Sequence, residues 1–95
     1  MAAYLIADLE ITDTPAFEEY RKRVPAVIAA HGGRYLARGG ATAVLEGSVT
    51  LHRTVIVEFE SMAALRAFYD SPEYRPLREL REESTRSTLI AIEGV

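Results

Sequence analysis

Apolar and polar residues alternate along two segments of the chain, and a period of two is typical of a strand with one buried face. These segments are Tyr4–Ile11 and His52–Glu60. On one face of the first segment lie Leu5, Ala7, Leu9 and Ile11. Two shorter apolar runs, Arg34–Arg38 and Thr88–Glu93, complete a set of four predicted strands.

Spacings of three and four residues predict a helix after the first strand. Asp13 and Thr14 offer N-cap oxygens, and Pro15 suits the first helical turn. The stripe facing the core would consist of Phe17, Tyr20, Val24, Val27, Ile28 and His31. Pro25 lies inside this pattern and should bend the helix without ending it.

Two glycine pairs flank the second predicted strand. Gly32 and Gly33 follow a helix, where a left-handed residue commonly closes the last turn, whereas phosphate-binding glycines open a helix. We therefore interpret this pair as a C-cap. Residues 39–51 are small, polar and interrupted by glycine, so they predict a hairpin connection in which residues 43–45 could continue the strand after a bulge.

The last helical region has two capping signals. Ser61 can cap a helix that breaks near Asp70, and Ser71 followed by Pro72 predicts a second start. The charged run Arg75–Arg86 then alternates in sign and is expected to be a solvated helix face.

The resulting order β-α-β-β-α-β predicts an α+β, ferredoxin-like domain over residues 1–95, with a four-stranded antiparallel sheet and the helices on one face. The other face would carry Tyr4, Ile6, Asp8, Thr54, Ile56 and Glu58. This face is too apolar to stay in water, and so small a domain gains stability by further burial. We expect a second copy of the chain to cover it.

Composition narrows the possible partners. The formal net charge of -3 argues against nucleic acid, whose phosphates are bound by clustered basic residues. The chain has no Cys, and its N-terminal segment lacks the basic start and long apolar run of a signal or membrane segment. We expect a cytoplasmic protein without a membrane partner.

Six segments along the chain form a specific combination: ITDTPAFEEY, AHGGRYLARGG, VLEG, TVIVEFES, AFYDSPEYRPLRELR and IEG. In these segments the whole chain resembles the family described as domain of unknown function 1330. That family belongs to the dimeric α+β barrel superfamily, in which ferredoxin-like protomers pair their open sheet faces. Cofactor-independent monooxygenases, lactone isomerases and haem enzymes occur elsewhere in the superfamily. The resemblance implies a homodimer and a cavity between sheet and helices, but no particular reaction.

A charged cluster is the first candidate for chemistry. Asp8 and Glu58 share a parity on neighbouring strands, so both carboxylates are expected on the open face. Two close carboxylates repel, so one would keep its proton or a cation would neutralise the pair. Arg38 is the candidate cation if its strand turns it toward that face. The alternative is an ion pair that locks the dimer, or charges that simply face water.

His31 and Tyr35 are the other candidate pocket residues. His31 can exchange protons near neutral pH, and the alternative is a histidine that caps the negative end of the helix. Tyr35, like Tyr69 and Tyr74, offers a phenol, and the alternative is a half-buried core residue. Two distant histidines without any Cys predict no metal site, and we expect no cofactor.

Two functions remain open at this level. One is a homodimer with a small-molecule pocket that supports cofactor-free chemistry of the proton-transfer, oxygenase or isomerase kind. The other is a non-catalytic binding or interaction protein whose charges stabilise the dimer. Whether the chain is an enzyme is not decided by its residues alone.

Overall fold

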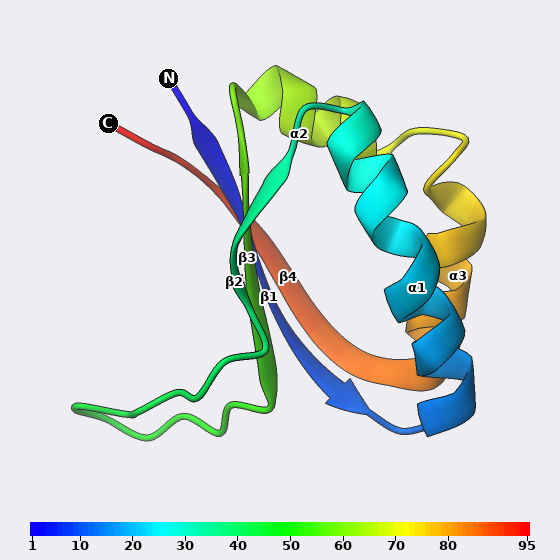
Figure 1. Cartoon of the computed structure of the whole chain (residues 1–95). Helices are drawn as coiled ribbons and strands as arrows, with labels where there is room; N and C mark the ends of the chain where they lie inside the picture. The colour runs from blue at the N-terminus through cyan, green and yellow to red at the C-terminus, as the bar shows by residue number, and fades with distance from the viewer.

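A four-stranded sheet forms one layer of the molecule and three helices form the other (Figure 1). The computed structural model describes residues 1–95. In chain order the elements are β1 (Ala3–Ile11), α1 (Thr14–Ala30), β2 (Arg34–Arg38), β3 (Arg53–Phe59), α2 (Met62–Tyr69), α3 (Arg75–Ser84) and β4 (Thr85–Glu93). Neighbouring strands are antiparallel in the order β2-β3-β1-β4. The predicted ferredoxin-like arrangement is confirmed, with the second helix divided in two.

The core lies between the two layers. Alternate residues of β1 and β3 face the helices, because successive side chains of a strand point to opposite faces. The buried sheet residues of these strands are Ala3, Leu5, Ala7, Leu9, Val57 and Phe59. Aromatic rings fill the centre: the Phe68 centroid lies 4.5 Å from that of Tyr74 and 5.4 Å from that of Phe59. Ile11, predicted on the buried face, is exposed because it ends its strand.

The ends of α1 follow from local hydrogen bonds. The Asp13 side chain accepts a bond from the backbone N–H of Ala16, and the helix continues through Pro25. At the other end, Gly32 adopts a φ of 77°, and the N–H of Gly33 donates to the carbonyl of Ile28 at 2.9 Å. This bond closes the helix as a Schellman motif, so the predicted C-cap is confirmed.

Gly33 also fixes how closely α1 approaches the sheet. A Cβ atom at this position would lie 2.7 Å from Ile28 Cγ2 and 2.7 Å from Phe59 Cε1. Real Cβ atoms do not approach carbon this closely, so the absence of a side chain lets the helix end pack onto the Phe59 ring.

Two boundaries differ from the sequence prediction. The Ser71 hydroxyl accepts a bond from the N–H of Tyr74, but it caps a turn, and α3 begins only at Arg75. Strand β4 begins at Thr85 rather than Thr88. Its polar first residues belong to the sheet because they pair with the end of β1, where Arg86 lies opposite Glu10.

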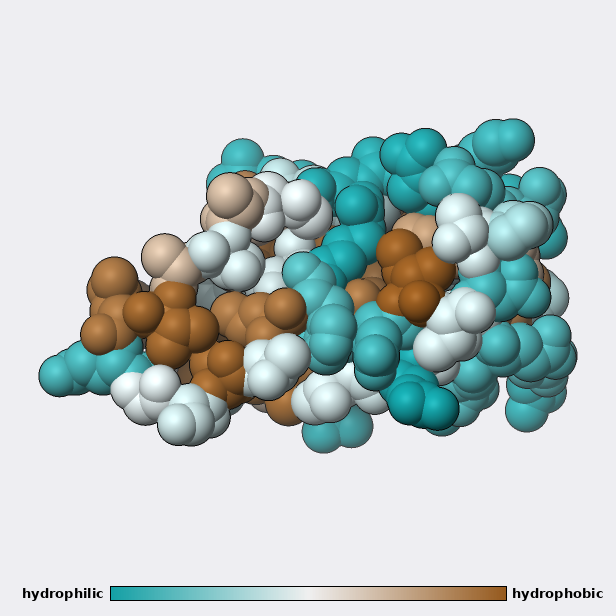
Figure 2. Space-filling model, turned by 90° about the horizontal axis from the view of Figure 1, so that it is seen from below, coloured by the Kyte–Doolittle hydropathy of each residue, from teal (hydrophilic) through white to brown (hydrophobic).

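The connection between β2 and β3 projects from the sheet on the side away from the helices (Figure 1). It forms no further strand, so residues 43–45 do not continue β2. Apolar side chains gather on this projection (Figure 2), and its exposed members are Val44, Leu45, Val49 and Leu51. None of the helices combines the length and apolar character needed to cross a membrane.

Candidate functional site

The two predicted carboxylates lie on the open face of the sheet but not beside each other. Asp8 of β1 pairs with Thr54, whereas Glu58 of β3 pairs with Tyr4, four residues further along the strand. This register confirms the prediction that the Asp8 and Glu58 side chains lie on the open face. Four positions along a strand keep the two carboxylates too far apart to form a repelling pair, and each has its own cationic or hydrogen-bonding partner.

Asp8 is bound by the start of β3. One carboxylate oxygen accepts a bond from the backbone N–H of His52 at 2.8 Å, and the other lies 2.9 Å from Nδ1 of the same residue. Thr54 Oγ1 donates a further bond at 3.3 Å. The ring of His52, then its backbone N–H, and Thr54 hold the pKa of Asp8 below its ordinary value. The sequence alone does not reveal this contact, because it depends on the register between β1 and β3.

The lowered pKa of Asp8 makes its contribution to stability dependent on pH. The folded state favours the carboxylate, so the contribution is present above the unfolded pKa of 3.8 and is lost as the pH falls through the lower folded pKa. We expect Asp8→Asn to lower the free energy of unfolding by about 0.5 kcal/mol at pH 7. The difference from wild type should vanish in acid. Urea unfolding between pH 2 and pH 7 measures it, with Glu46→Gln at the exposed loop tip as the control; a pH-independent difference would contradict the assignment.

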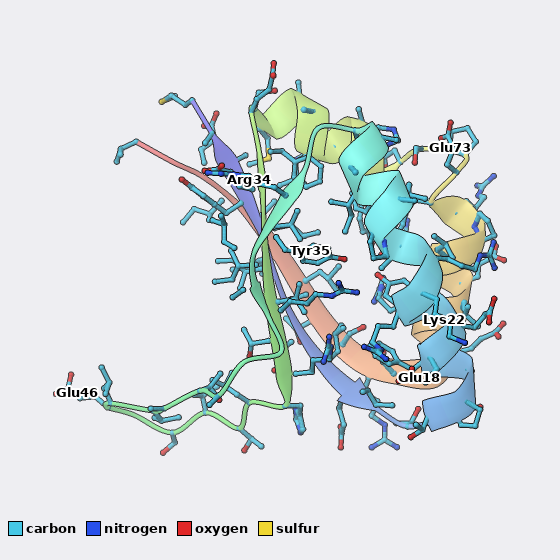
Figure 3. The ribbon with its side chains drawn as sticks, in the orientation of Figure 1. Glu18, Lys22, Arg34, Tyr35, Glu46 and Glu73 are labelled. Atoms are coloured by element: carbon cyan, nitrogen blue, oxygen red, sulfur yellow. The ribbon has the colours of Figure 1, made fainter.

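Arg38 faces the helices, so the condition under which it would neutralise the carboxylates is not met. The pairing between β2 and β3 shifts by one residue after Tyr35, so that Ala37 lies opposite Ile56 and Arg38 opposite Val55. This bulge at Leu36 reverses the facing of the residues that follow. Arg34 instead donates to Glu58 at 2.7 Å on the open face. Arg34 and Tyr35 point to opposite sides of the sheet in Figure 3.

His31 has the capping role that was the alternative interpretation. It is the C-cap residue of α1, and its Nδ1 lies 3.0 Å from the carbonyl oxygen of Val27. Its ring meets that of Phe68 edge-on, with the centroids 5.9 Å apart. His31 contacts neither carboxylate and does not line the cavity described next, so the five predicted residues do not form one pocket.

A cavity of about 40 Å³ lies between the sheet and helices α1 and α3. Since a water molecule needs roughly 10–15 Å³, the cavity has room for a few waters. Of its 17 lining residues, 13 are hydrophobic, and the other four are arginines. Tyr35 and Arg38 are the two predicted site residues that line it.

One end of the cavity contains a buried polar network. The hydroxyls of Tyr20 of α1 and Tyr74 are 3.0 Å apart, and Nε of Arg81 of α3 donates to the Tyr74 hydroxyl at 3.3 Å. Arg81 also donates from Nη1 to the Ser87 hydroxyl of β4. All three network members are buried: Tyr20, Tyr74 and Arg81 are 8%, 1% and 4% exposed.

Burial and the neighbouring groups set the protonation of this network. Burial, followed by the effect of Tyr74, raises the pKa of Tyr20 far above its ordinary value. Burial opposes the charge on Arg81, yet the hydroxyls of Tyr74 and Tyr20 raise its pKa overall. At neutral pH Tyr20 is therefore a protonated phenol and Arg81 a charged guanidinium.

The remaining three arginines lie nearer the opening. Arg38 stacks on the Tyr35 ring, with its central carbon 4.6 Å from the centroid, and donates to the carbonyl of Arg21. Arg53 of β3 lies 5.8 Å from the centroid of Phe17. Burial raises the pKa of Tyr35, while Arg38 and Arg53 oppose this shift. No His, Asp, Glu, Ser or Cys lines the cavity, so none of its side chains can accept a proton near neutral pH.

Sequence reasoning missed Arg81 because it lies in a charged run that was interpreted as a solvated helix face. A signal was present, since Tyr74, Leu77, Arg81 and Ser84 recur at spacings of three and four. All four are buried. An arginine at the spacing of buried helix residues therefore indicated, in the sequence, a buried polar group at one end of the cavity. His, Cys, Asp and Glu form no cluster of three that could hold a metal ion.

The family model described as Domain of unknown function (DUF1330) matches residues 2–95 of the chain. No curated protein sequence matches this chain significantly.

Several solved structures share the fold at low sequence identity. A protein of unknown function from Rhodopseudomonas palustris is 19% identical, with a TM-score of 0.80 over 99% of this chain and 82% of that one. The cofactor-independent oxygenase SnoaB from Streptomyces nogalater is 14% identical, with a TM-score of 0.68 over 99% and 93%. A dimeric ferredoxin-like protein of unknown function from Jannaschia sp. CCS1 is 16% identical, with a TM-score of 0.67 over 99% and 100%.

Proposed function

The chain belongs to the DUF1330 family, whose description names no reaction, and from its geometry we propose that it is a homodimer that binds a small apolar molecule in each protomer. The site is the cavity between the sheet and helices α1 and α3. The observation that carries the proposal is an apolar cavity closed at one end by the Tyr20–Tyr74–Arg81 network. Apolar walls with a few convergent polar groups are typical of ligand sites.

The lining residues favour binding over proton transfer by the protein. A general base must lie within hydrogen-bond reach of the proton that it removes. The candidate bases Asp8 and Glu58 lie on the opposite face of the sheet, and His31 does not line the cavity. The arginines and phenols can hold a ligand and stabilise its negative charge, but they cannot remove its proton.

A catalytic role is the second candidate, and the fold shared with SnoaB favours it. That protein is a cofactor-independent oxygenase. A ligand that ionises without help would need only stabilisation of its anion, which the arginines of the cavity can supply. Oxygen consumption in the presence of a bound ligand would separate this role from binding alone.

Self-association rests on the open face of the sheet. Several neighbours are described as dimeric ferredoxin-like proteins. In this chain Leu36, Ile90 and Ile92 are 50%, 53% and 52% exposed on the sheet. A second copy would remove these apolar side chains from water, which is the main driving force for association.

The proposed site can be tested with a substitution that fills the cavity. Val55 of β3 lines it, and we expect Val55→Phe to weaken the binding of small aromatic compounds at least tenfold. Val27→Phe makes the same change on α1 outside the cavity and should leave affinity unchanged. Ligand-observed NMR and thermal shift provide the affinities. Equal binding by both variants, or no binding to wild type, would contradict the proposed site.

A further inference from the structure

Arg81 carries a buried charge without an acidic partner. Its residue is 4% exposed, and no carboxylate oxygen lies within 4.0 Å of its nitrogen atoms. Both of its side-chain bonds go to neutral hydroxyls, those of Tyr74 and Ser87. A guanidinium stays protonated in proteins, and a buried charge is costly unless it is paired. The network therefore has an unbalanced positive charge.

The phenols beside Arg81 add a donor to this charge. The Tyr74 oxygen accepts from Arg81, so its own hydrogen can serve the bond to Tyr20. In that arrangement the Tyr20 hydroxyl hydrogen has no protein acceptor and can be donated to a ligand. Because the raised pKa of Tyr20 keeps the phenol protonated, this end of the cavity offers hydrogen-bond donors to a ligand.

The charges at the opening have the same sign. Neither Arg38 nor Arg53 forms an ion pair, and only Arg21 is paired, with Glu18 at 2.8 Å. No acidic residue lines the cavity, although the chain as a whole has a net charge of -3. Arginines that line a low-dielectric cleft raise the local concentration of anions.

Size and wall chemistry restrict the anion. The walls beyond the network are hydrophobic, and the cavity of about 40 Å³ must widen to take even one ring. The exposed Arg38 is bonded to α1 through a single hydrogen bond to the carbonyl of Arg21, so its side chain and the Tyr35 ring on which it stacks can shift to admit a ligand. A second charge close to the first would lie against apolar walls, because the other three arginines lie nearer the opening, and such a placement is unfavourable.

We propose that the ligand is a small apolar monoanion, a carboxylate on a short aliphatic or single-ring body, whose charged end pairs with Arg81 and accepts from Tyr20. This inference rests on the proposed binding function and names the class of ligand. A carboxylate matches the fork of a guanidinium and accepts two bonds from it.

The test compares benzoate with its neutral analogues benzamide and benzyl alcohol on the wild-type protein by equilibrium dialysis at pH 7. We expect benzoate to bind at least tenfold more tightly than either neutral compound. Equal affinity for all three would overturn the anion inference and leave the proposed binding site intact. Absence of binding by all three would overturn both.

Substitutions test whether the preference for benzoate over its neutral analogues comes from Arg81 and Tyr20. Arg81→Gln should weaken benzoate binding at least tenfold and leave benzamide unchanged, and Tyr20→Phe should weaken benzoate a few-fold. Arg78→Gln, on the exposed part of α3, is the matched control. If Arg81→Gln does not fold, Tyr20→Phe keeps the ring and still tests the donor. An unchanged preference for benzoate in every folded variant would overturn the assignment to this network.

Discussion

Ile90→Asp is expected to convert a dimer into a monomer. Ile90 of β4 lies opposite Ile6, which in turn lies opposite Ile56, so the three form an apolar row across the open face. In a monomer an aspartate at this edge of the row is hydrated. In a dimer that pairs the open faces, the same carboxylate loses its water without gaining a partner, which costs several kcal/mol.

Light scattering after size-exclusion chromatography measures the change in molar mass. Wild type should have twice the mass of one chain at micromolar concentration, and Ile90→Asp should have the mass of one chain. Ala29→Asp, exposed on α1 on the other side of the molecule, should remain dimeric. A monomeric wild type, or an Ile90→Asp variant that associates as tightly as wild type, would contradict the open face as the interface.

Phe68→Ala is expected to cause the largest loss of folding stability. Phe68 of α2 is 1% exposed and lies between the rings of Phe59, Tyr74 and His31. Removal of a buried phenyl ring costs about 3–5 kcal/mol, because transfer energy and packing are both lost. A domain of this kind has about 5–15 kcal/mol in total, so the variant should be close to its unfolding threshold at 37 °C.

Urea or guanidinium unfolding gives the change in free energy for this variant. Phe68→Leu refills most of the space and should lose less than half as much stability. A loss below about 1 kcal/mol for Phe68→Ala would show that the aromatic cluster is not the centre of the core.

Most of the fold could be predicted because its pattern is local. Alternation along β1 and β3 defines which residues face the helices, and capping residues define where α1 begins and ends. The start of β4 could not be predicted in this way. Thr85, Arg86 and Ser87 are polar, and they join the sheet only because the end of β1 is there to pair with them.

The site depended on features that a single strand or helix does not reveal. The facing of Arg38 follows from one extra residue at Leu36, and alternation along β2 gives the opposite facing. The partner of Asp8 follows from the register between β1 and β3. Arg81 is different: its spacing from Tyr74 and Leu77 was visible in the sequence, but its charge suggested solvent. Most arginines in proteins are exposed, and a buried arginine on an apolar stripe is an exception.

The strand order also restricts how the chain can fold during synthesis. β1 precedes the other strands along the chain and leaves the ribosome before them, yet it is central in the sheet and pairs with β3 and with β4. The pairing of Ala3 with Glu93 spans almost the whole described chain. Contacts of such long sequence separation form slowly. One hydrogen-bonding edge of β1 therefore has no partner until β4 has been synthesised, and during that interval it is open to pairing with other chains.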